Sequence, residues 1–424
     1  MEKSDLIEEL RLQNPWWTGG EPPIPEDVVE RDILHDFLSE IRKKTITGLI
    51  GLRRTGKTTL LRMLIKDLLK ENDGKRICYF SFDLGQDVDI RTLVKVYSEE
   101  IIKEPYGTYH DRIYFFFDEI QKLDRWGDLL KSIQDRDMNI KFFVTGSSSM
   151  NITKGAGESL VGRIKIRRLN PFSFREYLRY VGEKTTDVNL LDLHYPKDAP
   201  TYRIRFNEYM ERGGFPELYD SWSKEDLKEI LDLIFFRDIV DMFTVKRTDV
   251  LKGLFIRIAE RSGQRINYAN LANDLNTQYR TIKDYLQYLE DSFLVSKSMP
   301  VEEDHIKASR KNPKMYASDH SFTCLWGTEK GHVAETVAFN HLNTFEHPCF
   351  NSEPEVDLVL PDRKIALEIK YRTKVDKKDA VNLLGMPKDY RTILVTEETY
   401  DRWIIDDREI EVIPLWLLTL CDLS

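Results

Sequence analysis

The chain has 424 residues, which exceeds one ordinary domain and predicts two or three. Hydrophobic residues make up 41% and charged residues 32%, a balance that excludes wholesale disorder and collagen-like repetition. The net charge of −9 argues against a wholly basic nucleic-acid binder. Residues 246–314 nevertheless hold thirteen Lys and Arg against nine Asp and Glu, so any nucleic-acid contact is expected there.

The four cysteines are scattered and form no CxxC pair, so they predict neither a zinc site nor a disulfide framework. The N-terminus carries acidic residues where a signal peptide needs an apolar core. A run of ~18 uncharged apolar residues, as a membrane span requires, does not occur in the sequence. We therefore expect a soluble, cytoplasmic protein without a membrane partner.

The first 25 residues are rich in Pro, Gly and Trp and predict an arm that has no long element and docks on the next domain. An amphipathic helix is plausible over 27–44, and a β-rich run follows at 45–50. Helix and strand patterns then alternate. This alternation, with nearly unbroken apolar strands, indicates an α/β fold whose parallel sheet is covered by helices on both faces. Strands are expected at 76–82, 112–117 and 141–145, and helices at 57–70, 88–103 and 126–134.

Beyond Pro171 the pattern is mostly helical to about residue 244, as expected of a helical lid. Three short helical patterns and a β-like stretch occupy about 249–301. Two of these helices, 268–275 and 277–289, are separated by only a residue or so, which fits a helix-turn-helix. After Asn312 short strands and helices return, so we place segment boundaries near 245 and 310.

Residues 51–58, GLRRTGKT, match GxxxxGK[ST] between a β-rich run and a helix. The glycines let backbone N–H groups surround phosphate oxygens, and the helix start adds its positive end. Lys57 is expected to reach the β and γ phosphates, and Thr58 to ligate Mg²⁺. Arg53 and Arg54 either line the triphosphate or are solvated cations of the loop. The candidate nucleotide-binding residues are Gly51, Arg54, Thr55, Gly56, Lys57, Thr58, Thr59 and Thr145.

The apolar strand at 112–117 ends in Asp118 and Glu119, the layout of a Walker B segment. Asp118 would hold the hydrated Mg²⁺, and Glu119 would polarise the attacking water. The next strand ends in hydroxyls, and Thr145 or Ser147 would either sense the γ-phosphate or cap a turn.

Five segments of the chain carry a family resemblance: GLRRTGKTTL, FFFDEIQ, VTGSSS, LVGRIKIRRLNPFSFREYL and GGFPEL. Together they resemble AAA-type ATPases of archaea and bacteria that carry a C-terminal restriction-endonuclease-like domain of unassigned function. The match covers nearly the whole chain. It implies an arm (1–25), an ASCE-type P-loop core (26–170), a helical lid (171–245), a winged helix (246–310) and a nuclease-like domain (311–424).

An arginine usually completes the site of such ATPases, and Arg163 is the candidate. It would act in its own subunit or in a neighbour's, and the second case would imply a homo-oligomer. The alternative is that Arg163 only pairs with an acidic residue beside the sheet.

The second helix of the helix-turn-helix is expected to bury Ile282, Leu286 and Leu289. Polar residues near the start of such a helix meet the major groove, so Arg280 and Lys283 are the candidate DNA contacts. The alternative is a structural hinge that passes movement from the lid to the terminus.

Residues 355–360 and 364–370, joined by a Pro-Asp-Arg turn, predict a β-hairpin. Period-2 alternation places Glu368 and Lys370 on one face. Carboxylates from adjacent strands can hold Mg²⁺, while Lys370 orients or helps to deprotonate a water.

A helix is expected at 331–342 before this hairpin, and a helix at 377–384 and a strand at 392–395 are expected after it. This order of elements resembles the PD-(D/E)xK nuclease core. The resemblance implies Glu335, Asp357 and Glu368 as metal ligands, and Asp357, Glu368 and Lys370 as catalytic residues. The proline of the motif is displaced, because Pro354 lies three residues before Asp357. A surface hairpin with a Glu-Lys pair, or a nuclease fold that binds DNA without cutting it, is the alternative.

The sequence thus favours an ATP- and Mg²⁺-dependent ATPase that acts on DNA. A nucleotide-gated regulatory switch, whose terminal domain only binds DNA or a protein partner, is the runner-up. An ATPase that acts on protein is the third possibility.

Overall fold

The computed structural model describes residues 2–83, 88–136, 138–147, 160–186, 188–190, 194–219, 222–240, 242–302 and 311–422. The chain forms two compact units, Met1–Asn170 and Pro171–Ser424. The four cysteines are free thiols, as expected. Within the described ranges, every helix is too short or too polar to cross a membrane.

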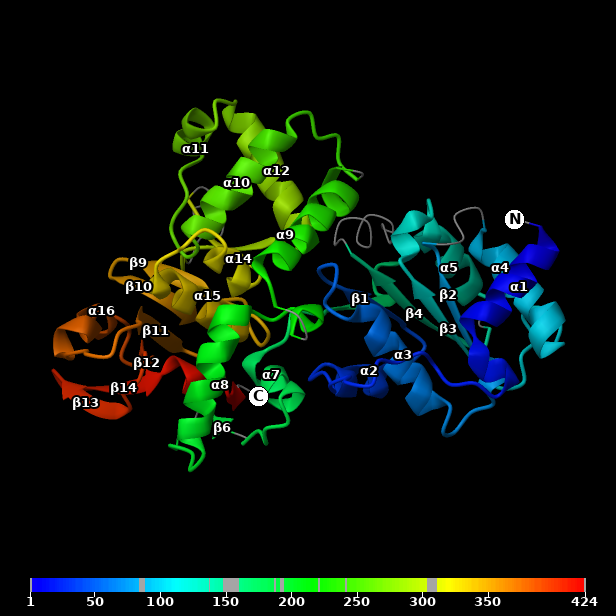
Figure 1. Ribbon diagram of the computed structural model, residues 1–424, viewed down its shortest axis with the longest axis horizontal. Coiled ribbons are helices and arrows are strands. Elements are labelled where there is room, and N and C mark those ends of the chain that lie inside the picture. Colours follow the sequence, from blue (N-terminus) through cyan, green and yellow to red (C-terminus); the bar gives the residue numbers. More distant parts are fainter. Residues whose placement is uncertain are drawn as a thin grey trace. The chain divides into compact units, whose positions relative to one another are not determined.

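The first unit is built on a five-stranded parallel sheet in the order β2-β3-β4-β1-β5, which confirms the expected α/β class (Figure 1). Strand β4 lies between β1, which leads into residues 51–58, and β3, which ends in Asp118. This order is consistent with a P-loop core. The strands are β1 (Ile46–Ile50), β2 (Ile77–Ser81), β3 (Ile113–Asp118), β4 (Ile140–Gly146) and β5 (Ile164–Arg168).

Alternating aromatic residues of β3 pack on opposite faces of this sheet. The ring centres of Phe116 and Phe143 lie 4.7 Å apart in a stacked arrangement. Both residues belong to the core cluster that includes the apolar side of α3. Phe115 faces the other way and meets Tyr97 of α4 at 5.1 Å. Helices therefore cover both faces, as the unbroken apolar strands predict. These helices are α2 (Leu34–Glu40) and α3 (Lys57–Leu68) on one side, and α4 (Ile90–Tyr97) with its neighbour α5 (Trp126–Gln134) on the other.

The N-terminal arm covers the edge strand β2. The Asn14 side chain bonds to both the N–H and the carbonyl of Tyr79, at 2.6 and 2.8 Å. The indoles of Trp16 and Trp17 donate to the Ile77 carbonyl at 3.0 and 2.9 Å. The expected docking is therefore confirmed, and the arm occupies backbone groups that an open edge would expose.

The expectation that the arm lacks a long element is wrong. Helix α1 spans Lys3–Gln13, because the breakers begin only at Asn14. In contrast, the helix expected over 27–44 is confined to α2. Short helical turns complete the first unit: η1 (Pro15–Thr18), η2 (Gly74–Arg76), the π-helix η3 (Ser98–Ile102) and η4 (Ile120–Lys122).

The second unit begins with the segment expected to be a lid. In the structure this segment belongs to the same compact unit as the terminal residues, because β6 (Val188–Asn189) pairs with β15 (Cys421–Asp422). Helix α8 also packs against α14 (His320–Cys324) and α17 (Leu415–Leu418). The helices of the segment are α7 (Phe174–Tyr180), α8 (Ala199–Arg212), η6 (Pro216–Leu218), α9 (Lys224–Leu233) and η7 (Ile234–Val240).

Three helices and a pair of antiparallel strands follow, and we call residues 246–302 and 311–317 the helix-and-hairpin segment. The helices lie close to their expected positions, and the first strand of the hairpin pairs with residues beyond the expected boundary at 310. The elements are α10 (Thr248–Glu260), α11 (Tyr268–Asp274), α12 (Tyr279–Asp291), β7 (Val295–Ser298) and β8 (Lys314–Ala317).

The terminal part is a six-stranded mixed sheet in the order β13-β14-β12-β11-β10-β9 (Figure 1). The expected hairpin is confirmed, with Leu358 opposite Leu367. Strand β11 continues into the sheet by parallel pairing with β12. The strands are β9 (Cys349–Ser352), β10 (Glu355–Leu360), β11 (Ile365–Lys370), β12 (Arg391–Thr396), β13 (Asp401–Ile405) and β14 (Arg408–Pro414). The helices are α14 (His320–Cys324), α15 (Lys330–Leu342), η8 (Lys377–Ala380), α16 (Val381–Leu384) and α17 (Leu415–Leu418).

The GGFPEL segment lies where the chain passes close to α14. A Cβ atom on Gly213 would stand 2.4 Å from Oδ1 of Asp319. The N–H of Gly214 donates to Oδ2 of the same carboxylate at 2.9 Å. Both glycines are therefore explained by packing within the second unit.

Candidate functional site

The loop between β1 and α3 has the backbone geometry that its glycines predict. Gly56 precedes α3 with φ 93°, in the left-handed region that favours glycine. At Gly51 a Cβ atom would stand 2.2 Å from the carbonyl oxygen of Leu169, so a side chain there is excluded. The Thr55 hydroxyl donates to the Leu52 carbonyl at 2.9 Å and holds the loop closed.

Lys57 turns its ammonium into this loop. The side chain is 6% exposed, and Nζ donates to the carbonyls of Gly51 and Leu52 at 3.0 and 2.9 Å. These acceptors are neutral, so phosphate oxygens would be stronger partners for the same ammonium. The residues therefore fit a triphosphate, and the loop leads directly into the N-terminus of α3.

Arg31, a buried arginine that the sequence analysis did not identify, donates hydrogen bonds to the loop and to residue 170. Arg31 donates from Nη1 to the Thr55 carbonyl at 2.7 Å and from Nη2 to the Asn170 carbonyl at 2.6 Å. It lies 24 residues before Thr55, in a segment without a local motif.

Asp118, at the end of β3, accepts hydrogen bonds from three hydroxyl groups. Thr58 donates to Oδ2 at 2.6 Å, and Tyr79 donates to the same oxygen at 2.8 Å. Thr145 donates to Oδ1. The structure thus brings the two predicted Mg²⁺ ligands of this site into contact, and oxygen donors of this kind suit Mg²⁺. Sequence reasoning missed Tyr79, whose role depends on β2 lying beside β3.

Glu119 follows with φ 53°, and its N–H donates to the Thr145 hydroxyl at 3.0 Å. Its carboxylate accepts a hydrogen bond from Gln121. Burial raises the pKa of Glu119, while the nearby Lys57 opposes that rise. Thr145 therefore contacts both predicted acidic residues, while Ser147 lies 3.3 Å from the Gln121 amide nitrogen.

Arg163 lies at the edge of the sheet opposite the loop. Its carbonyl accepts from the N–H of Ile46, at the start of β1, whereas the loop follows the end of that strand. Five residues of strand separate the two ends by roughly 15 Å. The side chain pairs with Asp135 at 3.2 Å, which is the alternative that the sequence left open. A role in a neighbour's site stays a prediction.

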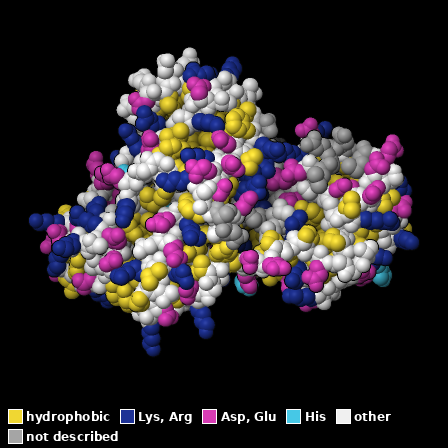
Figure 2. Space-filling view, viewed as in Figure 1, with side chains coloured by type: hydrophobic (Ala, Val, Ile, Leu, Met, Phe, Trp, Pro, Cys, Tyr) yellow, Lys and Arg dark blue, Asp and Glu magenta, His cyan; other side chains and the backbone are white. Residues whose placement is uncertain are grey.

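The predicted DNA contacts lie on α12. This helix buries Ile282, Leu286 and Leu289 as expected, and Arg280 and Lys283 are exposed. Lys283 Nζ lies 5.0 Å from the ring centre of Tyr279. Figure 2 shows Lys and Arg side chains interspersed with Asp and Glu over the face in view. DNA binding by α12 stays a prediction.

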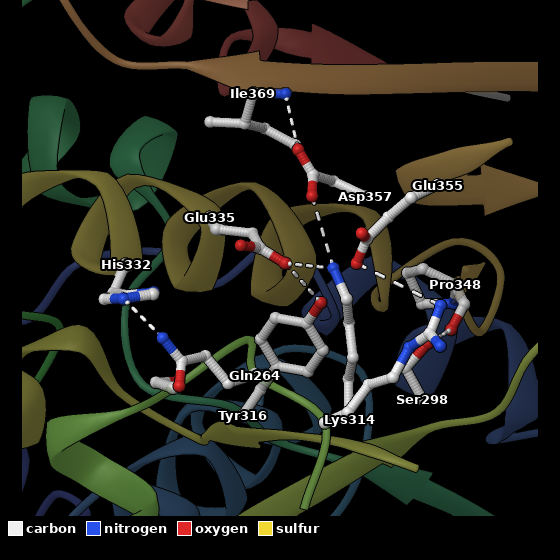
Figure 3. Close-up of polar contacts among 12 residues, drawn as sticks. Gln264, Ser298, Lys314, Tyr316, His332, Glu335, Pro348, Glu355, Asp357 and Ile369 are labelled. Atoms are coloured by element: carbon white, nitrogen blue, oxygen red, sulfur yellow. Dashed lines mark hydrogen bonds and ion pairs between the residues drawn. The ribbon is translucent and has the colours of Figure 1, made fainter. Parts of the chain in front are cut away.

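In the terminal sheet, two of the predicted carboxylates are joined by a lysine (Figure 3). Lys314 Nζ lies 2.9 Å from Oε1 of Glu335 and 3.2 Å from Oδ1 of Asp357. The Tyr316 hydroxyl donates to the same oxygen of Glu335 at 2.7 Å. The second oxygen of Asp357 accepts from the Ile369 N–H at 3.0 Å.

Glu368 pairs with Lys370 at 2.7 Å, on the face that period-2 alternation predicts. Its Oε2 atom is buried and has no hydrogen-bond partner among the described residues. Burial, reinforced by the Asp357 charge, raises the pKa of Glu368 to about 7. Burial also raises the pKa of Glu335 to about 7, against the pull of Lys314.

The predicted metal ligands of the terminal sheet do not fit a metal ion as they are arranged. Within the described residues, no group of three or more His, Cys, Asp and Glu side chains is placed to hold a metal. Lys314 occupies the position between Glu335 and Asp357 instead. No local motif marks this lysine, which lies 21 and 43 residues from its two partners.

Two family models match the chain. Residues 43–178 match the family described as AAA domain, and residues 203–329 match a domain of unknown function, DUF8612. An uncharacterized protein of Methanocaldococcus jannaschii is 26% identical, over 99% of this chain and 96% of its own length. An uncharacterized protein of Haemophilus influenzae is 25% identical, over 87% of this chain and 93% of its own.

Among solved structures, a Walker-type ATPase of Pyrococcus abyssi superposes with a TM-score of 0.43 at 15% identity, covering 73% of this chain and 99% of its own. The family match spans the loop, Asp118 and Glu119, and it coincides with the five-stranded sheet. Residues 43–178 are therefore similar to the AAA domain that this family model describes.

Proposed function

We propose that the chain binds ATP with Mg²⁺ and hydrolyses it at the loop of residues 51–58. The observation that carries this proposal is the 2.6 Å hydrogen bond between Thr58 and Asp118. It joins the start of α3 to the end of β3, one residue after Lys57 in the chain. A hydroxyl, a carboxylate and an ammonium thus surround the place where the phosphates of a nucleotide would lie.

Each residue of the site has a distinct task in this proposal. Lys57 exchanges its two carbonyl partners for phosphate oxygens and stabilises the charge that develops on them. Thr58 and Asp118 would hold Mg²⁺, which neutralises charge on the phosphates when bound. Glu119 accepts the proton of the attacking water, and burial favours this by raising its pKa. Thr145 fixes the carboxylate of Asp118 and the backbone of Glu119.

Replacing Lys57 tests the proposal. Lys57→Ala should abolish phosphate release and weaken ATP binding in calorimetry, because the main cationic contact with the phosphates is lost. Lys66→Ala is the matched control, since Lys66 is exposed on the same helix. Full turnover by Lys57→Ala would refute the assignment of the loop.

We also propose that the chain acts on DNA through the helix-and-hairpin segment. The exposed cations at the start of α12, Arg280 and Lys283, support this. Duplex DNA should raise ATP turnover in the wild type, and Arg280→Ala should reduce that stimulation and its dependence on salt. Unchanged turnover with DNA would favour an ATPase that acts on protein.

The pairing of Lys314 with Glu335 and Asp357 favours a nucleotide-gated regulatory switch over an ATPase whose terminal domain cuts DNA. In a nucleotide-gated switch, the terminal domain binds DNA or a protein partner without cutting. Incubation of plasmid and linear DNA with Mg²⁺ or Mn²⁺, with and without ATP, separates the two. Uncut DNA throughout supports the switch, whereas metal-dependent cutting that both Asp357→Ala and Glu368→Ala abolish would establish a nuclease.

A further inference from the structure

The carboxyl group of Glu335 is covered by the helix-and-hairpin segment. Gly263, after α10, approaches so closely that a Cβ atom would stand 2.7 Å from the Glu335 carboxyl carbon. The φ of Gly263 is 88°, a conformation that also favours glycine. Its N–H donates to the Met315 carbonyl at 2.8 Å, which ties this turn to β8. The segment therefore lies directly on the carboxylate.

Strand β8 supplies both side chains that bind Glu335. Lys314 and Tyr316 are two residues apart, so they project from the same face of the strand. Both are buried, and Lys314 is 3% exposed. Its ammonium lies between the two carboxylates, at hydrogen-bonding distance from each.

Further contacts surround the cluster and join the same two parts of the second unit (Figure 3). Gln264 lies 3.0 Å from His332, and Ser298 donates to the Pro348 carbonyl at 2.8 Å. The Arg265 guanidinium stacks at 4.8 Å over Phe350, a residue of β9. The cluster is thus the centre of a continuous interface.

This arrangement conflicts with a divalent cation at the same place. Mg²⁺ demands an octahedral oxygen shell at about 2.0–2.1 Å and usually keeps several waters. Gly263 leaves no room beside Glu335 for such a shell. The ammonium already lies within hydrogen-bonding distance of both carboxylates, and a second cation beside it would be repelled in a medium of low dielectric constant.

We propose that Lys314 is the resident cation of this cluster, and that Glu335 and Asp357 bind the helix-and-hairpin segment instead of Mg²⁺. The carboxylates that resemble a nuclease centre then serve as an internal docking site. The terminal sheet and the helix-and-hairpin segment move as one body, and the terminal sheet recognises a partner without metal-dependent cutting. This inference is independent of ATP hydrolysis, which belongs to the other unit.

Metal binding and thermal unfolding of the full chain without nucleotide test the proposal. Mn²⁺ titrated into the wild type should show no site at the cluster, and Mg²⁺ should leave the Tm of the second unit unchanged. Lys314→Ala should lower that Tm by about 10 °C, because two buried carboxylates lose their counter-ion. Mn²⁺ or Mg²⁺ should not restore this loss, because Gly263 still lies against Glu335. Lys297→Ala, which breaks an exposed ion pair on β7, is the matched control and should change little.

A double substitution covers the case in which Lys314→Ala fails to fold. Lys314→Met combined with Asp357→Asn removes one positive and one negative charge together. It should unfold at a higher Tm than Lys314→Met alone, because less uncompensated charge stays buried. Wild-type binding of Mn²⁺ that Asp357→Asn abolishes would overturn the proposal. An unchanged Tm in Lys314→Ala would overturn it as well.

Discussion

Each unit of the chain contains a buried lysine among oxygen atoms, and the two lysines differ in what holds them. Lys57 donates to two backbone carbonyls of its own loop. Lys314 binds two carboxylates that come from α15 and β10. A hydrogen bond between a charged and a neutral group contributes about 1.5–3 kcal/mol, whereas breaking a buried ion pair costs about 3–5 kcal/mol. The ion pairs of Lys314 are therefore more costly to break than the two hydrogen bonds of Lys57 to carbonyls.

The glycines at the two sites show the same contrast. A Cβ atom on Gly56 would meet only the Arg31 guanidinium, at 3.7 Å. On Gly263 it would overlap the carboxyl group of Glu335. The backbone of Gly263 thus packs directly on a carboxylate of the terminal part, whereas a Cβ atom on Gly56 would meet no backbone among the described residues.

Replacing a glutamate by glutamine should lower ATP turnover in the first site and leave it nearly unchanged in the second. Glu119→Gln should lower ATP turnover by about 10²–10⁴-fold with ATP binding retained, because the proton acceptor is lost. Glu368→Gln should leave turnover within about twofold, since we assign Glu368 no part in hydrolysis. Phosphate release and calorimetry with ATP measure both variants. Equal losses in the two variants would mean that the carboxylates are not functionally distinct.

Two tyrosines sharpen the contrast, because each donates to a buried carboxylate. Tyr79→Phe removes a donor to Asp118 and should lower turnover by roughly tenfold, since a hydrogen bond to a charged group contributes about 1.5–3 kcal/mol. Tyr316→Phe removes a donor to Glu335 and should lower the stability of the second unit by a similar energy, with turnover unchanged. Turnover assays and urea unfolding of both variants separate the effects. A drop in turnover with Tyr316→Phe would contradict the assignment.

Sequence alone predicts the parts of these sites that are local in the chain. Residues 51–58 and Asp118 lie at the ends of strands whose apolar runs are unmistakable, so the contact between Thr58 and Asp118 follows from a parallel sheet. The hairpin of β10 and β11 follows equally from period-2 alternation and a turn. These features depend on a few consecutive residues, which is why the expectations agree with the structure.

The residues that sequence reasoning missed act across long separations. Tyr79 lies 39 residues from Asp118, and Lys314 lies 43 residues from Asp357. Neither has a motif of its own, because each depends on which strands become neighbours. Helix α1 was missed because the Pro and Gly residues were counted over all of the first 25 residues. They follow Leu6 and Leu10, the two buried apolar residues of this helix. Tertiary packing decides these points, and no local propensity records it.

Glu40 offers the reverse of the Lys314 arrangement, with one buried carboxylate between two lysines. It lies 2.9 Å from Lys43 and also pairs with Lys165. Burial would raise the pKa of Glu40, but the two lysines outweigh it and lower the pKa to about 2. Because the folded pKa lies below the unfolded value of 4.5, the stabilisation is complete above about pH 4.5 and is lost as the pH falls toward 2.

Glu40→Gln should therefore destabilise the first unit at pH 7 by about 1–2 kcal/mol, a figure reduced for the solvent that screens the two half-exposed lysines. The difference between variant and wild type should shrink steadily below pH 4.5, as Glu40 becomes protonated in the wild type. Urea unfolding between pH 7 and pH 3 measures it, with Asp67→Asn, which breaks an exposed ion pair on α3, as the control. A difference that stays constant over this range would mean that packing of Glu40, and not its charge, supports the sheet.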